Sequence, residues 1–208
     1  MTHMKPPQRP NSEFPELGRL ITLIDGVYAV ALTLLVLDLK LPQNTSLVSA
    51  LRQMLPGFLV YLITFASIAG YWMIHHGTFR HIAHGDGRLV FLSLINLLFV
   101  TLFPLSASIV GSHPLEPLAA ACLSANSLLY CMSAWAIWSH AAANRHLIAE
   151  KADSRRLQQS GRMMLFVAAG LALAIPLAFV SIYIAYAIWI LYTPIAGLWL
   201  RARRRPST

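Results

Sequence analysis

Long apolar segments separated by short polar ones run through almost the whole of this 208-residue sequence. Each apolar segment approaches the length of about 20 residues that a helix needs to cross the hydrocarbon core of a bilayer. The pattern therefore predicts an all-α membrane protein with six transmembrane helices per subunit. Their expected positions are residues 17–39, 57–76, 89–110, 118–139, 163–182 and 183–200.

Breaks in the apolar pattern set the expected boundaries. The last two helices are nearly continuous, and the sequence places their break within residues 181–186. Between the first two, residues 45–55 are expected to form a separate short amphipathic helix. Thr45 would cap its start, because a threonine side chain accepts a hydrogen bond from a free backbone N–H. The Pro56-Gly57 pair would end it.

The chain is expected to divide into three parts. Residues 1–16 are polar and rich in proline, a composition typical of a disordered tail. Residues 17–205 form the predicted six-helix transmembrane domain, and residues 206–208 a short cytoplasmic end.

Composition supports a membrane protein. Hydrophobic residues make up 57% of the chain and charged residues only 12%, against about 25% in soluble domains. The mean hydropathy is +0.60. The formal net charge of +8 would suggest nucleic-acid binding in a soluble protein, but here the positive residues lie beside the apolar segments. Membrane topology therefore explains the charge, and no nucleic-acid partner is expected.

The distribution of lysine and arginine predicts the orientation. Six spans place both termini on one side, and only Lys40 and Arg52 lie on the other side. By the positive-inside rule, both termini are cytoplasmic in a multi-pass protein of the cell membrane. The cluster from Arg201 to Arg205 is expected to contact lipid headgroups, so membrane lipids are expected partners.

The motif search argues against an enzyme. The sequence contains no Gly-x-Ser-x-Gly elbow, no His-Glu-x-x-His zinc motif and no glycine-rich phosphate loop. We expect neither catalytic residues nor a cofactor.

A carboxylate inside the first apolar segment is the most informative polar residue. Asp25 lies at membrane depth, where insertion scales assign a charged side chain a cost of about 2.5–3.5 kcal/mol at the helix centre. Such a residue needs a partner or a function. Arg19, six residues earlier, is one candidate partner.

The same segment carries a helical face made of Val30, Thr33, Leu34 and Leu37. In one interpretation it is an ordinary buried stripe in which Thr33 bonds its own backbone. In the other it lines a pore, where aliphatic rings form a hydrophobic constriction and threonine oxygens contact a cation. Asp38 at the non-cytoplasmic end either attracts cations to the pore mouth or pairs with Lys40.

The second segment places Trp72 and His75 on one helix face, three residues apart. His75 could bind a metal or haem, sense pH, or hydrogen-bond a buried carboxylate, or could have no specific role. Asp25 and His75 lie at similar depth, so a contact between them is feasible. In the third segment, Asn96 is expected to form interhelical hydrogen bonds.

Several of these residues together resemble the transmembrane protein 175 family of potassium channels. The resemblance starts with Arg19, Asp25 and the segment that follows, and it continues through Trp72-Met73-Ile74-His75 and Phe103-Pro104. It spans roughly residues 16–112. The family pattern is Arg, three residues, then Phe-Ser-Asp, and here Leu23 and Ile24 replace the phenylalanine and serine.

The resemblance implies a homotetramer in which the first helix of each subunit lines a central pore. It implies a constriction at Val30, a hydroxyl layer at Thr33 that contacts potassium transiently, and a second hydrophobic ring at Leu37. The network of Arg19, Asp25, Trp72 and His75 would lie behind the pore.

The implied activity is a potassium-selective cation channel with modest preference over sodium. The main alternative is a proton-conducting or proton-coupled transporter that uses Asp25 and His75. A haem protein or membrane enzyme using His75 and His76, and a purely structural membrane protein, are the other possibilities.

Overall fold

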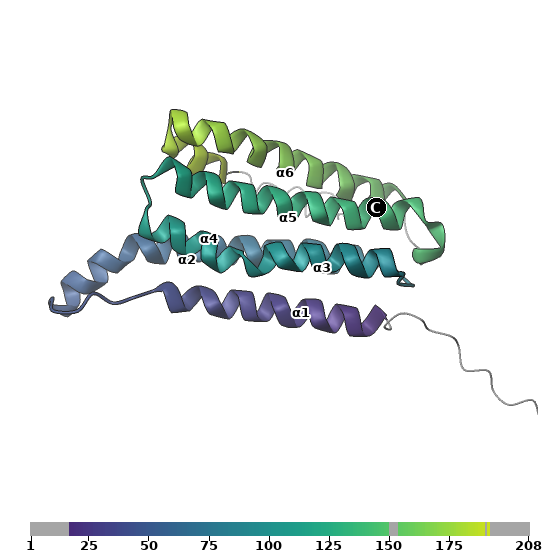
Figure 1. The fold of residues 1–208 in the computed structure, drawn as a ribbon, viewed down its shortest axis with the longest axis horizontal. Coiled ribbons are helices and arrows are strands. Elements are labelled where there is room, and N and C mark those ends of the chain that lie inside the picture. The colour runs from purple at the N-terminus through teal and green to yellow at the C-terminus, as the bar shows by residue number, and fades with distance from the viewer. Residues whose placement is uncertain (1–16, 150–153, 190, 192–208) are drawn as a thin grey trace, which may run out of the picture.

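The computed structural model describes residues 17–149, 154–189 and 191, and their regular structure is helical (Figure 1). Helix α1 spans Leu17–Leu34 and continues into a 3₁₀ turn, η1, over Leu35–Asp38. The remaining elements are α2 (Leu47–Phe79), α3 (Gly87–Thr101), α4 (Phe103–Ser112), α5 (Pro117–Ala143), η2 (Arg145–Leu147) and α6 (Ser154–Val180). Residues 182–189 are also helical.

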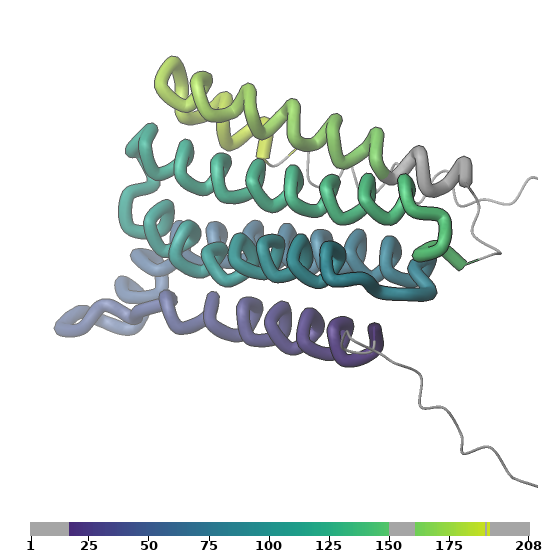
Figure 2. Tube along the Cα trace, turned by 45° about the vertical axis from the view of Figure 1, so that its right-hand side comes forward, coloured from purple at the N-terminus to yellow at the C-terminus, as the bar shows by residue number. Residues whose placement is uncertain are grey.

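The long helices lie side by side in layers. Helix α1 forms one side of the bundle, α2, α3 and α4 form the middle, and α5 and α6 form the opposite side, as two views show (Figures 1 and 2). Helix α1 packs against α2, α3 and α4, whereas α5 packs against α3, α4 and α6. Helix α1 is therefore the outermost helix on its side of the protomer.

Five helical segments of the described chain are long and apolar enough to cross a membrane: Leu17–Asp38, Leu47–Phe79, Gly87–Ser112, Pro117–Ala143 and Gly161–Val180. They confirm the first five predicted spans. A helix break at Ser181 falls inside the predicted boundary, but most of the predicted sixth span lies outside the described residues, as do residues 1–16 and the Arg201–Arg205 cluster.

The third predicted span is two helices rather than one. Helix α3 ends at Thr101, and α4 begins at Phe103 with a proline in its first turn. Proline lacks a backbone N–H and clashes with the preceding helical turn, but it is well accommodated at a helix start, where that N–H has no partner. Pro104 therefore divides the span into two helices, which together are still long enough to cross the membrane.

The separate amphipathic helix expected at residues 45–55 is absent, because α2 runs unbroken from Leu47 through Pro56 to Phe79. Its N-cap is Ser46, whose side chain accepts from the backbone N–H of Ser49, and not Thr45. At 33 residues, α2 is about 50 Å long, which exceeds the roughly 30 Å of a hydrocarbon core. Its start projects beyond the bundle (Figure 1). There the carbonyl that Pro56 leaves without a partner can bond to water.

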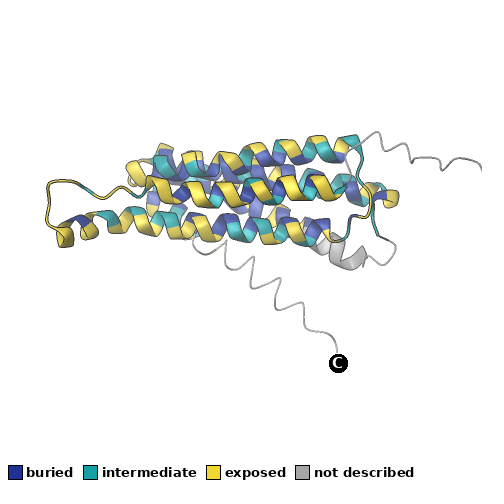
Figure 3. Cartoon of the chain, turned by 90° about the horizontal axis from the view of Figure 1, so that it is seen from below, coloured by how far each residue is buried: buried dark blue, intermediate teal, exposed yellow. Residues whose placement is uncertain are grey.

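Burial separates the inside of the bundle from its outer surface. The largest fully buried side chains include Tyr28 of α1, Phe103 of α4 and Tyr130 of α5. Viewed from the α1 side, the outer helix faces are largely exposed (Figure 3). These faces are apolar, as expected for a surface that contacts lipid or another subunit.

Candidate pore helix and its anchors

Helix α1 has one buried face and one exposed face. The buried face consists of residues spaced three or four apart: Leu20, Ile24, Tyr28, Ala31 and Leu35. Opposite it lies the predicted pore face, and all four of its residues are exposed: Val30 is 56% exposed, Leu34 43% and Leu37 68%, and Thr33 is also classed as exposed. Within the protomer, this face is not the buried stripe of the first interpretation.

The 3₁₀ turn η1 changes the spacing at the end of the pore face. A 3₁₀ helix has about three residues per turn, so side chains three apart lie directly above one another. Leu37 therefore sits over Leu34, and both remain on the exposed side. Asp38 ends the turn and is exposed. The structure does not pair it with Lys40, because the one ion pair among the described residues joins two other side chains.

The Thr33 hydroxyl is oriented by its own helix. Its Oγ1 donates to the carbonyl oxygen of Val30 over 2.8 Å. A hydroxyl has one proton and two acceptor lone pairs, so this bond uses the proton and leaves the lone pairs free. The exposed threonine can therefore present oxygen to a cation while its backbone contact is kept.

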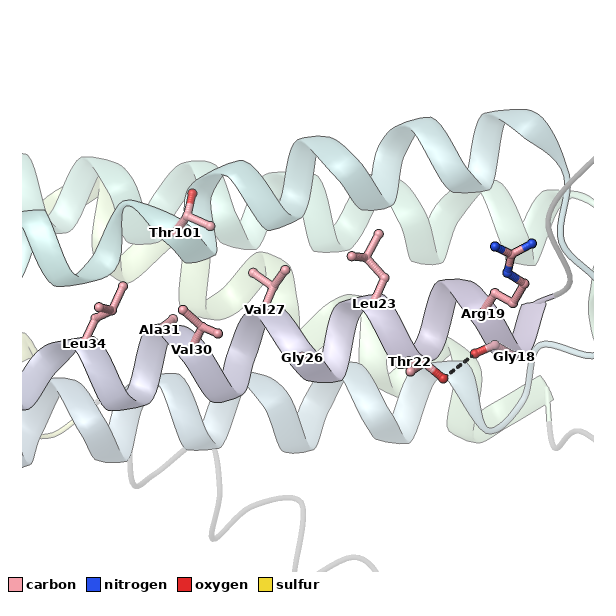
Figure 4. Close-up of a pocket in the computed structure, with 10 residues that line it drawn as sticks. All are labelled: Gly18, Arg19, Thr22, Leu23, Gly26, Val27, Val30, Ala31, Leu34 and Thr101. Carbon is pink, nitrogen blue, oxygen red and sulfur yellow. Dashed lines mark hydrogen bonds between the residues drawn. The ribbon is translucent and has the colours of Figure 1, made fainter.

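The exposed face of α1 opens into an apolar groove of about 800 Å³ that reaches Thr101 on α3. In Figure 4, Leu23, Val27 and Leu34 point into the space between α1 and the neighbouring helix that carries Thr101. The complete lining is Gly18, Arg19, Thr22, Leu23, Gly26, Val27, Val30, Ala31, Leu34 and Thr101. The groove is apolar apart from a few hydroxyls and one arginine.

Asp25 is held by the second helix. The indole N–H of Trp72 donates to its Oδ1 over 2.8 Å, so the structure brings together these two members of the predicted network. Arg19 is exposed and makes no ion pair with Asp25 in the described protomer. Six residues turn a helix by about 240° beyond a full turn, which places Arg19 on a different face, where it lines the groove.

His75 is buried beside this pair without a hydrogen bond to Asp25. Its ring stacks on Phe79 at 4.2 Å between centroids and lies 6.0 Å from the ring of Tyr28. Adjacent His76 instead stacks on Trp72. The described residues contain no group of three histidine, cysteine or acidic side chains that could hold a metal ion, so the metal-site interpretation gains no support.

The two residues that replace the family's Phe-Ser pair occupy different environments. Ile24 is almost completely buried and joins the core, whereas Leu23 lines the groove. Ile24 is therefore packed inside the protomer, and Leu23 presents its aliphatic side chain to the groove.

A second contact between α1 and the bundle was not foreseen. The hydroxyl of Tyr28 lies 2.8 Å from that of Tyr130 on α5. The Tyr130 hydroxyl also donates to the carbonyl oxygen of Tyr71 on α2 over 3.2 Å. A usable signal existed in the sequence, because tyrosines inside apolar spans need partners for their hydroxyls. That Tyr28 pairs with Tyr130, 102 residues away, could not be predicted from the sequence.

Asn96 confirms the expectation of interhelical hydrogen bonding. Its amide nitrogen donates to the Ser133 hydroxyl over 2.8 Å and to the Tyr130 carbonyl over 3.2 Å, which ties α3 to α5.

The end of the bundle where α1 begins carries the ion pair. Asp86 caps α3 by accepting from the backbone N–H of Leu89 over 2.7 Å, and its other oxygen lies 2.8 Å from His140 Nε2 on α5. Burial opposes ionisation of Asp86, but the Leu89 N–H, His140 and nearby His146 outweigh it and lower the pKa of this carboxyl. Nearby, the Ala83 N–H donates to the Leu147 carbonyl over 2.7 Å and the Ala149 N–H donates to the His81 carbonyl over 2.9 Å. These two bonds join the α2–α3 and α5–α6 loops.

Comparisons with known proteins give matches over most of the chain. A family model described as the endosomal/lysosomal potassium channel TMEM175 matches residues 19–104. A potassium channel of Chamaesiphon minutus is 31% identical over 181 residues, which cover 83% of this chain and 89% of that protein. The endosomal/lysosomal proton channel TMEM175 of Homo sapiens is 32% identical over 110 residues, 48% of this chain but only 22% of that protein.

Solved structures share the fold. The lysosomal potassium-selective channel TMEM175 homologue from Chamaesiphon minutus superimposes with a TM-score of 0.78 and 28% identity, covering 88% of this chain and 96% of that one. The potassium channel MtTMEM175 superimposes with a TM-score of 0.66 at 16% identity, covering 94% and 98%.

Proposed function

Because this chain belongs to the TMEM175 family of ion channels, we propose that it forms a homotetrameric channel that conducts potassium in preference to sodium. The observation that carries the proposal is the two-sided α1 helix. One side is anchored in the protomer, and the predicted pore face, with Val30 at its centre, is exposed. An exposed face on an edge helix is what a subunit needs if several copies are to enclose a pore.

The chemistry of this face suits a hydrophobic constriction next to an oxygen layer. A ring of Val30 side chains repels water unless the pore widens, because aliphatic rings gate by dewetting. Thr33, one turn further, supplies hydroxyl oxygens whose lone pairs are free for a potassium ion. A few hydroxyls replace little of an ion's hydration shell, so selectivity over sodium is expected to be modest. Asp38 at the mouth would raise the local cation concentration.

Leu34 and Leu37 would extend the apolar lining between Thr33 and the mouth. Valine is smaller than leucine or isoleucine, so the Val30 ring would be the wider of the two hydrophobic rings. Conduction would require α1 to move, because the constriction excludes water in its narrow state. With both termini cytoplasmic, as the lysine and arginine distribution predicts, Asp38 would face outward across the cell membrane.

Reconstitution in a planar bilayer tests the proposal. The wild type should carry potassium current, Val30→Trp should abolish or strongly reduce it by filling the constriction, and Thr33→Ala should lower the potassium-to-sodium permeability ratio. Leu173→Trp is the matched control, because Leu173 is 60% exposed on α6, on the opposite side of the bundle from α1. Absence of potassium current from the wild type at every voltage and pH would contradict the proposal.

Proton conduction is the second candidate, favoured by the human relative, which is named a proton channel. In this chain the candidate groups are Asp25 and His75, which lie within electrostatic range of each other. Proton flux into vesicles that disappears in Asp25→Asn, in protein that passes no potassium, would favour this activity over the first.

A further inference from the structure

The hydroxyl-to-hydroxyl contact behind the pore face carries an inference about how α1 is positioned. Tyr28 is 1% exposed and Tyr130 2% exposed, so no water competes for their hydroxyls. A buried hydroxyl in a membrane span needs a partner, and this pair supplies it between the proposed pore helix and α5.

The direction of the hydrogen bonds follows from the third member. Tyr130 donates its single proton to the Tyr71 carbonyl, because a carbonyl can only accept. Both bonds form together only when Tyr28 donates to the Tyr130 oxygen. The chain of bonds runs from α1 to α5 to α2, and Tyr130 is its central member.

Tyr130 is itself held rigidly. Its ring lies 4.4 Å from that of Tyr71 and 6.0 Å from that of Phe103, between centroids. Its carbonyl accepts from Asn96 on α3. Helices α2, α3 and α4 thus fix the point at which α1 is bound.

That point controls the rotation of α1 at the constriction. Tyr28 precedes Val30 by two residues, a turn of about 200° at roughly 100° per residue, so it holds the opposite side of the helix. Asp25, one turn earlier, is bound by Trp72. Two attachment points one turn apart fix both the position and the rotation of the pore helix.

We propose that Tyr130 is a positioning residue for conduction, which sets the rotation of α1 through Tyr28 and so the orientation of Val30 and Thr33. The role rests on the proposed channel function. A gating movement that rotates α1 must either break the Tyr28–Tyr130 hydrogen bond or move Tyr130 together with α1. Loss of this bond therefore changes the balance of open and closed channels, while the side chains that line the pore stay the same.

Single-channel recording of Tyr130→Phe tests this role. The variant keeps the ring but leaves the Tyr28 hydroxyl without an acceptor. The ratio of open to closed time should change about fivefold, the effect of one buried hydrogen bond, while unitary conductance stays the same. Tyr28→Phe should have a smaller effect, because Tyr130 keeps its bond to Tyr71. The double variant should lie closer to the wild type than Tyr130→Phe, because it no longer buries an unpaired hydroxyl.

Ser124→Ala is the matched control. It removes a buried hydroxyl from α5 that donates to the Ala120 carbonyl and accepts from Trp189, and that hydrogen-bonds neither Tyr130 nor α1. It should lower thermal stability and leave the open-to-closed ratio unchanged.

Three results would overturn the role of Tyr130. They are an unchanged open-to-closed ratio in conducting Tyr130→Phe channels, a change of the same size in Ser124→Ala, and failure of both tyrosine variants to assemble. A silent wild type would instead overturn the channel function and this role with it.

Discussion

Helices α1 and α5 reverse the usual relation between apolarity and burial. In the most apolar stretch of α1 and η1 the mean hydropathy is 2.3 and 28% of the residues are buried, whereas in that of α5 the mean hydropathy is 1.3 and 61% are buried. In a membrane the solvent is itself apolar, so polar side chains belong inside, where other helices satisfy them. Helix α5 therefore lies inside the protomer, whereas α1 keeps one apolar side exposed.

The buried polar residues of α5 show how this helix is held. Ser124 and Ser127 bond to their own backbone, and Asn126 donates to the Phe99 carbonyl on α3. Helix α1 has no comparable set and depends on the Asp25 and Tyr28 contacts. Few attachment points suit the role proposed for α1, in which the helix moves to open the channel.

The largest expected effect comes from a glycine packed against α5. A Cβ on Gly161 of α6 would lie 2.5 Å from the Trp138 ring on α5, which is closer than real contacts allow. Gly161→Ala should therefore push the two helices apart and cost about 3 kcal/mol of stability, the upper end for overpacking, because several atoms of a rigid ring lie in the way. A lower melting temperature in detergent and loss of the assembled protein would show it.

Gly26 on α1 provides the matched substitution, because a Cβ there meets nothing within 4 Å in the protomer. Gly26→Ala should leave the folded protomer as stable as the wild type. Equal destabilisation by Gly161→Ala and Gly26→Ala would mean that α1 is packed as tightly as α5, which would contradict the difference in burial between the two helices. A loss of tetramer alone in Gly26→Ala would place a neighbouring subunit in the groove.

The grouping of residues on the faces of α1 was predictable from sequence because it follows the 3.6-residue repeat. Periodicity placed Val30, Thr33, Leu34 and Leu37 together but left open whether their face was buried, and the structure shows it exposed. The contact of Asp25 with Trp72 needed the family resemblance, because 47 residues separate them. The Tyr28–Tyr130 bond could not be predicted, since nothing local specifies which of several buried hydroxyls meet.

The incorrect predictions concern helix boundaries at two prolines. Pro56 was expected to end a helix, but α2 continues through it at an exposed site where one missing bond is inexpensive. Pro104 was expected to lie inside one helix, but the chain restarts there as α4. Both outcomes depend on what surrounds the proline, which the sequence does not state.

The next effect in size is at the Asp25 attachment of α1. Trp72→Phe keeps an aromatic ring but removes the N–H that binds the carboxylate. A charged group left without its hydrogen bond inside a membrane should cost about 1.5–3 kcal/mol. Thermal unfolding in detergent measures the loss.

Asp25→Asn is the paired variant. It keeps an acceptor oxygen for Trp72 and removes the charge, so it should be less destabilising than Trp72→Phe. The reverse order would mean that the charge of Asp25 has a partner other than Trp72, for which Arg19 of a neighbouring subunit would be the first candidate.

The smallest expected effect concerns Asp86, at the end of the bundle where α1 begins. Asp86→Asn keeps a capping side chain but loses the charge that pairs with His140, so it should cost about 0.5–1 kcal/mol near neutral pH, as partly exposed ion pairs do. Asp86→Ala also removes the cap and should cost about 1 kcal/mol more.

Because folding lowers the pKa of Asp86, the stabilisation by its carboxylate is complete above the ordinary aspartate pKa of about 4 and is lost as pH falls through the lower pKa of the folded protein. The difference in melting temperature between wild type and Asp86→Asn should therefore be present at about pH 5 and close below about 4. A difference that persists unchanged in strong acid would show that the Asp86 charge does not stabilise this end. The loops would then be joined by their backbone bonds alone, and α1 would begin beside a less rigid support than the one α5 provides.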